Sequence, residues 1–273
     1  MRLVVLTSVR CGVASQCLPV LCGHPSLEVA AVILAHGASP NLRSQRRRQL
    51  KKLLRIGPLG ALNGVRIRPW FREPGVEDIA AVCSRHKVRL LESDFINCAR
   101  TRELFREAGA DLGLSLGNGF IGRSVFSIPR FGMINIHTEI LPRFQGAQSI
   151  LWPIHDGVNE TGFTIHRIDD HIDTGEILYQ RVLPLEFCRR IEDTVRVNRR
   201  RVGALVPAAM AHVCENYEAL CSAAQPQSRG RSYTTPSLWQ FLRMVRNNRR
   251  FFEQQERART AIAQSASARA GRF

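Results

Sequence analysis

The 273-residue sequence contains no apolar run close to the about 18–20 residues that a membrane-spanning helix requires. Its longest apolar runs, residues 29–35 and 204–213, are much shorter. The apolar run at residues 3–6 is also shorter than the roughly 7–15 apolar residues of a secretory signal. The sequence therefore predicts a cytoplasmic protein with no membrane partner.

Paired cysteines are missing as well. None of the eight cysteines forms a CxxC pair, which argues against zinc ribbons and thioredoxin-like redox motifs. We expect free, reduced thiols, as is usual in the cytoplasm. Histidines and aspartates crowd into residues 166–173, but their spacing matches no standard metal site. We therefore expect a protein without a bound metal.

Acidic residues are scarce in two segments that hold most of the net charge of +16. Residues 42–55 carry seven basic side chains and no acidic one, and residues 226–273 carry ten arginines and two glutamates. The rest of the chain is nearly neutral. This distribution argues against a nucleic-acid-binding surface over the whole protein and predicts two local elements that attract anions.

The first basic segment, an insertion over residues 42–60, allows two interpretations. In one, residues 42–55 form a solvated amphipathic helix with Leu50, Leu53 and Leu54 packed inward and the arginines facing water. In the other, the seven unopposed charges hold the phosphates of an anionic substrate, because such a partner relieves their mutual repulsion.

Strand and helix patterns alternate along residues 1–222. Residues 3–6 and 29–34 are continuous apolar runs, typical of buried parallel strands, and a helical pattern separates them. This opening predicts an α/β fold, a Rossmann-like, mostly parallel twisted sheet with helices on both faces. Further strands are predicted at 65–67, 88–91, 111–116, 133–136, 163–168 and 177–185, with an antiparallel pairing for the last.

Helical patterns dominate the later part of the chain. A long helix predicted over residues 191–221 contains Pro207, which should kink or break it. Residues 223–273 are predicted to form a small, basic, partly helical C-terminal extension. Its amphipathic stretch lies at 238–252, and we expect the last twenty residues to be mobile.

Residues 117–122 match the pattern GxGxxG and follow a predicted strand. A dinucleotide site would need a helix to begin there, and Pro129 and Gly132 leave no room for one. The glycines are better explained by a tight turn at the carboxyl edge of the sheet, where α/β proteins bind their ligands.

Three polar side chains suggest acyl-type chemistry. Asn135 and His137 are two residues apart at a strand end, so both face the same side of the sheet. Asp173 follows downstream beside a glycine turn. An amide that stabilises an oxyanion, an imidazole that moves a proton and a carboxylate that tunes the imidazole would together serve acyl transfer. The spacing alone leaves a purely structural role open.

These three residues lie in blocks that resemble the folate-dependent formyltransferases. NIHTEILPRFQG begins at Asn135, ETGFTIHRI follows, and IDTG contains Asp173, in the order and spacing of that family. The resemblance covers about residues 1–185. It implies that 10-formyltetrahydrofolate is the formyl donor and that Asn135, His137 and Asp173, hereafter the trio, are catalytic. Glu139 is a departure, because serine is usual at that position.

The resemblance also implies binding residues. A pterin pocket is expected at residues 116–121, a folate loop at 141–142, and the acceptor beside the trio. The expected donor-binding residues are Leu116, Gly117, Asn118, Phe120, Ile121, Leu141, Pro142 and Asp169. The expected acceptor-binding residues are Arg10, Gln145 and Gly146.

The fold does not choose the acceptor amine. Residues 8–15 contain one glycine, unlike the Gly-rich phosphate loop of glycinamide ribonucleotide transformylases. About fifty residues follow Cys221, without the strand alternation of the C-terminal barrel in methionyl-tRNA formyltransferases, although that branch also inserts a loop where residues 42–55 lie. We expect a nucleotide-linked amino sugar as acceptor, with tRNA as the alternative and a homodimer as one option for the assembly. A non-catalytic binding protein with the same fold is the third hypothesis.

Overall fold

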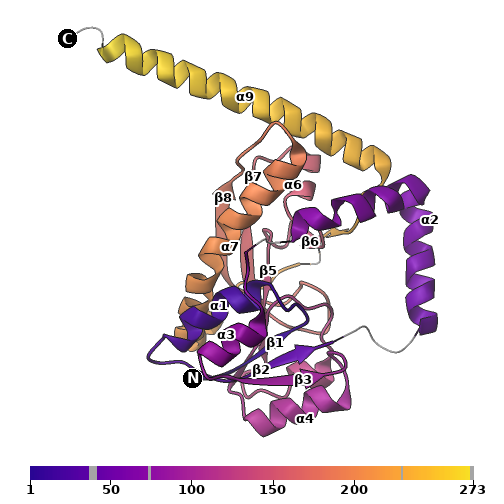
Figure 1. Cartoon of the computed structure of the whole chain (residues 1–273), viewed down its shortest axis with the longest axis vertical. Coiled ribbons are helices and arrows are strands. Elements are labelled where there is room, and N and C mark those ends of the chain that lie inside the picture. Colours follow the sequence, from indigo (N-terminus) through magenta and orange to yellow (C-terminus); the bar gives the residue numbers. More distant parts are fainter. Residues whose placement is uncertain (37–41, 73–74, 229, 271–273) are drawn as a thin grey trace.

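The structure is a computed structural model that describes residues 1–36, 42–72, 75–228 and 230–270 (Figure 1). A seven-stranded sheet in the order β3-β2-β1-β4-β5-β7-β8 lies at its centre. The first five strands in this order are parallel, and β7 and β8 are added antiparallel at one edge. The strands are β1 (Arg2–Thr7), β2 (Glu28–Ala35), β3 (Arg89–Ser93), β4 (Leu112–Ser115), β5 (Met133–His137), β7 (Glu160–Arg167) and β8 (Ile177–Pro184).

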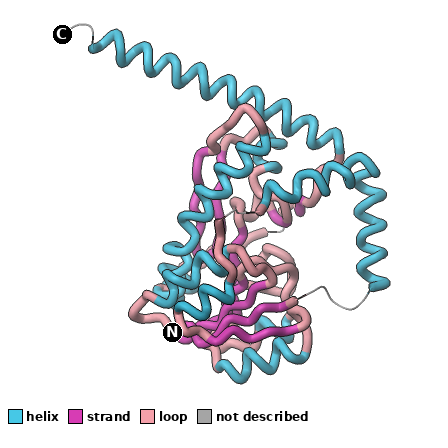
Figure 2. The backbone as a smooth tube through the Cα atoms, in the orientation of Figure 1, coloured by secondary structure: helices cyan, strands magenta, loops and turns pink. Residues whose placement is uncertain are grey.

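Helices cover both faces of the sheet, as predicted (Figure 2). Alternate side chains of β1 divide between two hydrophobic clusters, because successive residues of a strand point to opposite faces. Leu3 and Val5 pack under α1 (Val13–Cys22), α3 (Ile79–Arg85) and α7 (Ile191–Glu215). Val4 and Leu6 pack on the other side, under α4 (Ala99–Ala108) and α5 (Arg123–Phe126).

A third hydrophobic cluster lies beside the sheet and joins distant parts of the sequence. It contains side chains of the 3₁₀ helix η1 (Arg68–Phe71), α6 (Leu151–Asp156), the start of α7, and α9 (Leu238–Ala270). A short parallel pair, β6 (Gln145–Gly146) with β9 (Ser232–Tyr233), lies next to it. The predicted C-terminal extension is therefore packed onto the body, after α8 (Tyr217–Ser222).

The basic insertion differs from two expectations. Residues 65–67, predicted as a strand, belong to α2 (Leu42–Ile67), which is broken at Gly57, where φ is +73°. Beyond Gly57, α2 packs closely on residues 235–237. The half before it stands apart from the sheet (Figure 1), so Leu50, Leu53 and Leu54 are exposed by 57%, 42% and 78% instead of packing inward.

Two helices are longer or more regular than predicted. α7 continues through Pro207 to Glu215, because burial of its neighbours Val206 and Met210 under the sheet outweighs one lost backbone hydrogen bond. Residues 254–273 were expected to be mobile, but α9 continues as a helix to Ala270. Alanine residues and neighbouring pairs of Arg and Glu favour the helical conformation there. No helix in the described part of the chain is both long and apolar enough to span a bilayer.

Candidate active site

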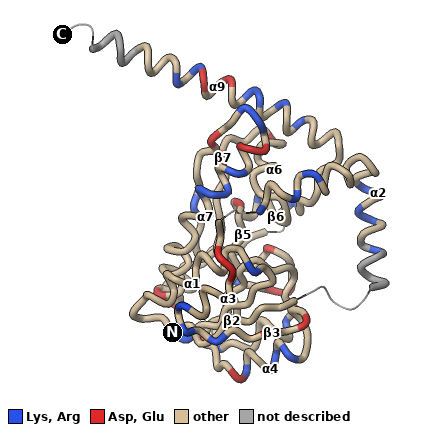
Figure 3. The backbone as a smooth tube through the Cα atoms, viewed as in Figure 1, with Lys and Arg blue, Asp and Glu red and all other residues tan. Residues whose placement is uncertain are grey.

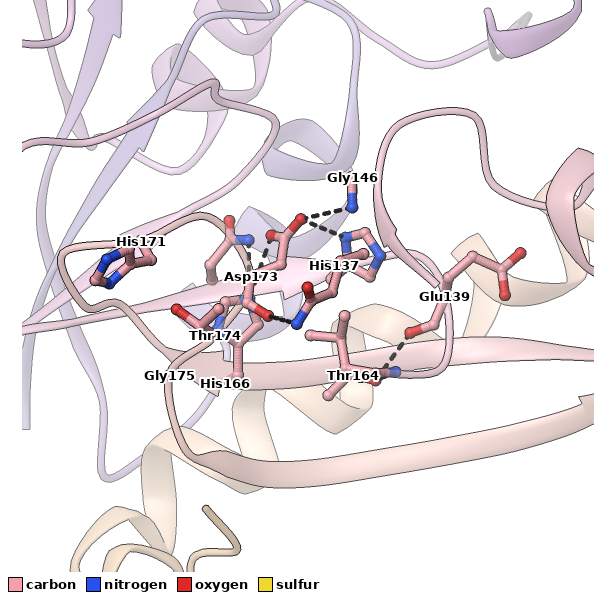
Figure 4. A network of polar contacts seen from close by, with 12 residues as sticks. His137, Glu139, Gly146, Thr164, His166, His171, Asp173, Thr174 and Gly175 are labelled. Carbon is pink, nitrogen blue, oxygen red and sulfur yellow. Dashed lines mark hydrogen bonds and ion pairs between the residues drawn. The ribbon is translucent and has the colours of Figure 1, made fainter. Parts of the chain in front are cut away.

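The trio comes together at the carboxyl edge of the sheet. Figure 4 shows His137 beside Asp173. Asn135 and His137 lie at the end of β5, and Asp173 lies in the loop between β7 and β8. The Nδ1 atom of His137 is 3.6 Å from Oδ2 of Asp173, and both side chains are about nine-tenths buried. The sequence pattern therefore placed the three side chains correctly, although their catalytic roles stay a prediction.

Backbone contacts determine which nitrogen of His137 is free to act. Its Nε2 lies 2.7 Å from the carbonyl oxygen of Phe144. A carbonyl oxygen can only accept, so Nε2 carries the proton and donates it to this contact. Nδ1 is then the basic atom of the neutral ring, and it faces Asp173. At 3.6 Å the two atoms are too far apart for a hydrogen bond, but they would form an ion pair if the ring were protonated.

Asp173 is held in place by β6. Its Oδ2 accepts a hydrogen bond of 2.9 Å from the amide of Gly146, and its carbonyl oxygen accepts one of 3.0 Å from the side chain of Gln145. Asp173 has a φ of +56°, a left-handed conformation that such contacts must maintain. Gln145 is buried and also accepts from the amide of Gly230. Gln145 and Gly146, predicted to bind the acceptor, thus position the carboxylate, although Gly146 also lines the cavity beside it.

His166 is a site residue that the sequence interpretation considered only as a metal ligand. It pairs directly with Asn135 across β5 and β7. Its Nδ1 lies 2.8 Å from the carbonyl oxygen of Arg167, so Nδ1 carries the proton and Nε2 accepts from Nδ2 of Asn135 at 3.2 Å. Burial lowers the pKa of His166 and keeps the ring neutral in this role. The contact orients the Asn135 amide and leaves its second N–H for another partner.

A cavity of about 400 Å³ opens beside the trio. All three trio residues line it, together with four of the predicted donor-binding residues. Those four are Gly117, Asn118, Phe120 and Ile121. Three residues of the C-terminal extension, 232–234, also line it, although no local feature of the sequence indicated this.

Four other predicted donor-binding residues do not line this cavity. Leu116 is completely buried in the core under α1 and α7. Leu141 and Pro142 border a separate cavity of about 530 Å³ next to β8. Asp169 accepts two hydrogen bonds from the Thr174 hydroxyl, at 2.7 and 2.9 Å, and shapes the turn before Asp173. These side chains support the walls of the site rather than face its interior.

A second cavity, of about 990 Å³, adjoins the first and shares Gly117, Ile136 and Thr138 with it. Its walls include the start of α1, η1 and α7, and they carry four arginines. The four are Arg72, Arg196, Arg199 and Arg200. Such a lining favours an anionic ligand.

The predicted acceptor residue Arg10 is not part of this wall. Its guanidinium binds the carboxylate of Asp78 through two contacts, of 2.8 and 3.2 Å. This partner raises the pKa of Arg10 and lowers that of Asp78. Arg196, Arg199 and Arg200 of α7, which the sequence did not single out, line the wall instead.

Within the described ranges, no three His, Cys, Asp or Glu side chains are grouped so that they could hold a metal ion. His166 and Asp173, at the two ends of the crowded segment, make the polar contacts of the trio instead, with His166 Nε2 3.7 Å from Asp173 Oδ1.

Comparison with known proteins agrees with this geometry. The family model described as "Formyl transferase" matches residues 89–209, which contain the trio and His166. This region of the chain belongs to the formyl transferase family. The formyl transferase domain accounts for β3 to β8 and most of α7.

Two relatives of the domain carry the names of formyltransferases with different acceptors. A methionyl-tRNA formyltransferase of Anaeromyxobacter dehalogenans is 35% identical over 159 residues, 58% of this chain and 46% of that protein. A GDP-perosamine N-formyltransferase of Brucella melitensis is 34% identical over 110 residues, 38% of this chain and 42% of that protein. The chain thus matches less than half the length of either relative.

The fold around the formyl transferase domain also has solved counterparts. An N-formyltransferase of Helicobacter canadensis, in complex with folinic acid and dTDP-3-aminofucose, superposes with a TM-score of 0.52. The superposition covers 90% of this chain and 80% of the Helicobacter chain, at 12% sequence identity. This likeness supports the α/β architecture of the domain and its surroundings.

Proposed function

We propose that this protein transfers the formyl group of 10-formyltetrahydrofolate to a primary amine on an anionic acceptor, a nucleotide-linked amino sugar. One observation carries the proposal: the trio faces a cavity that continues into a second, arginine-lined cavity. A donor in the first cavity and an acceptor in the second would meet at Asn135 and His137.

The first cavity suits the pterin end of the donor. Its size lies in the range typical of small-molecule sites, and its walls combine apolar side chains with a few polar groups. Phe120, Ile121 and Ile172 supply apolar surface for a flat ring. The four arginines in the wall of the second cavity would hold the phosphates of the acceptor in a separate place.

The contacts of the trio support a sequence of steps. The acceptor nitrogen attacks the formyl carbon, a C–N bond forms, and the formyl oxygen takes up the electron pair. The free N–H of the Asn135 amide donates to that oxygen, a type of contact worth about 10²–10³ in rate. His137 Nδ1 receives a proton from the attacking amine, and the carboxylate of Asp173 stabilises the resulting positive charge as its ion-pair partner.

Collapse of the intermediate completes the transfer. The bond from the formyl carbon to N10 of the folate breaks, and N10 takes a proton as it leaves. The protonated His137 is the proton source in the site, so the ring returns to its neutral form with Nε2 still bound to Phe144. The products are an N-formyl acceptor and tetrahydrofolate.

The second cavity favours a nucleotide-sized acceptor. Its volume of about 990 Å³ suits a sugar nucleotide, and guanidinium groups are well matched to a diphosphate. Phe71 on its wall offers an aromatic surface. The Brucella and Helicobacter proteins, named for or solved with nucleotide-linked amino sugars, agree with this choice.

Methionyl-tRNA is the second candidate. The exposed basic half of α2 could contact tRNA phosphates, and the Anaeromyxobacter relative is a methionyl-tRNA formyltransferase. The two acceptors differ in salt dependence, because a tRNA held at several phosphates releases more counterions than a diphosphate does.

A panel of acceptors tests the proposal. The protein is incubated with 10-formyltetrahydrofolate and, separately, GDP- and dTDP-linked amino sugars, methionyl-tRNA and glycinamide ribonucleotide, and products are detected by mass spectrometry. We expect formylation of an amino-sugar nucleotide, lost in His137→Ala. Formylation of methionyl-tRNA alone would contradict the acceptor. Donor binding without any formylation would favour the non-catalytic hypothesis.

A further inference from the structure

Exposed apolar side chains gather on two helices outside the active site. In the described part of the chain, sixteen large apolar side chains are exposed, and ten of them lie on α2 or α9. On α2 they are Leu50, Leu53, Leu54, Leu59, Leu62 and Val65, and on α9 they are Trp239, Leu242, Val245 and Ile262. Spacings of three and four residues place Leu50, Leu53 and Leu54 on one side of the first half of α2, which is broken at Gly57. The same spacing groups Leu59, Leu62 and Val65 on its second half, and Trp239, Leu242 and Val245 at the start of α9.

The same helices carry most of the excess positive charge. Arg47, Lys51, Lys52 and Arg55 are exposed on the first half of α2, where the sequence has no acidic residue. Figure 3 shows this basic half of α2 standing apart from the sheet. The start of α9 adds exposed arginines, among them Arg243 and Arg246.

These two helices contact each other. α2 and α9 pack together, and Gly60 of α2 lies close to Ser237 just before α9. The second half of α2 thus joins the exposed residues of α2 to those at the start of α9. The exposed residues among 47 and 49–65 of α2 and 239–246 of α9 are hereafter the amphipathic surface. It combines rows of leucine, valine and tryptophan with a high density of positive charge.

Charge complementarity decides which occupant fits. A second copy of this chain would bring the same positive charge and be repelled. RNA would match the arginines and lysines but offers nothing for rows of exposed leucine. The interface of an anionic bilayer accepts both, because acyl chains take up apolar side chains and headgroups attract basic ones.

We propose that the amphipathic surface binds the face of membranes that contain anionic phospholipids. Leucine, valine and tryptophan side chains enter the boundary between headgroups and acyl chains, while the flanking arginines and lysines contact the headgroup phosphates. The protein lies on such a membrane and does not span it, which departs from the sequence-based expectation of no membrane partner. Arg55 donates to Thr234 on the wall of the smaller cavity, but no residue of the amphipathic surface lines either cavity, so this proposal does not depend on the proposed function.

Vesicle flotation tests the proposal with the full-length protein. Vesicles of phosphatidylcholine alone are compared with vesicles containing one-third phosphatidylserine. We expect binding to the anionic vesicles only, weakened by salt. Arg47→Gln, Lys51→Gln and Lys52→Gln together should reduce the partition coefficient on the order of a hundredfold, at roughly fivefold per charge.

The leucines provide the decisive comparison. Leu50→Ser, Leu53→Ser and Leu54→Ser together should reduce binding to anionic vesicles by about tenfold or more, because the buried apolar area is lost. The matched control is Val182→Ser, an exposed apolar residue on β8, which should bind like the unchanged protein. Circular dichroism and thermal midpoint confirm that each variant folds, since all these side chains are exposed.

Several outcomes would overturn the proposal. Equal binding to neutral and anionic vesicles, or no binding to either, would do so. So would leucine variants that bind as well as the unchanged protein. A dimer in analytical ultracentrifugation that the leucine changes dissociate would assign the surface to a second copy. A tRNA complex lost in the charge variant but kept in the leucine variant, together with absent vesicle binding, would assign it to RNA.

Discussion

Replacing Glu139 by glutamine changes the response of protein stability to pH. Glu139 occupies the position where the resembling family has serine, and its side chain is 3% exposed. One carboxyl oxygen accepts from the amide of Ile150 and from the hydroxyl of Thr161. The other oxygen has no hydrogen-bond partner among the described residues. Ile150 has a φ of +73° and lines the larger cavity, so this contact supports a strained part of its wall.

Burial raises the pKa of Glu139 from 4.5 to about 8. The folded protein therefore holds this proton more tightly than the unfolded chain does. Stability at this site is fully present below about pH 4.5, falls as the pH rises towards 8, and is constant above that. One pKa unit corresponds to ~1.4 kcal/mol, so the free energy of unfolding should fall by roughly 5 kcal/mol across this window. Solvent hardly screens this carboxyl group, because its side chain is buried.

Urea unfolding at several pH values between 4.5 and 8.5 measures the effect. Glu139→Gln retains an oxygen that can accept from Ile150 but cannot ionise. The difference in unfolding free energy between the variant and the unchanged protein should therefore shift in favour of the variant by roughly 5 kcal/mol from pH 4.5 to 8. Glu160→Gln, at an exposed carboxylate, is the control and should show no such shift. Parallel pH profiles for Glu139→Gln and the unchanged protein would refute the reasoning.

Three further predictions concern catalysis. His137→Ala and Asp173→Asn should each lower kcat by about 10²–10³, and the double change should cost much less than the product, because the two groups act as a unit; additive losses would separate their roles. Arg200→Ala should raise the KM for the acceptor and leave that for the folate donor unchanged, with Arg181→Ala as the exposed control; an altered donor KM alone would move the acceptor elsewhere. Chelators should leave turnover intact, and loss of activity restored by zinc would contradict a metal-free mechanism.

The amino-acid sequence determined the elements whose signal is local. Continuous apolar runs identified β1 and β2, because parallel strands covered on both faces need apolar residues at every position. The two-residue spacing of Asn135 and His137 placed both on one side of β5, because side chains alternate along a strand. The Gly-rich turn after β4 was correctly placed at the cavity, since a turn that requires glycine is also a local property.

Tertiary structure decided the features that depend on distant partners. His166 became a contact of Asn135 only through the antiparallel pairing of β5 with β7. Gly146 and Gln145 became supports of Asp173 because β6 passes beside its loop. The C-terminal residues 232–234 line the cavity beside the trio because β9 pairs with β6, nearly ninety positions away. The leucines of α2 stayed exposed since the turn at Gly57 carries them away from the sheet. No local pattern encodes which surface a helix or strand meets, because that depends on packing between segments far apart in the chain.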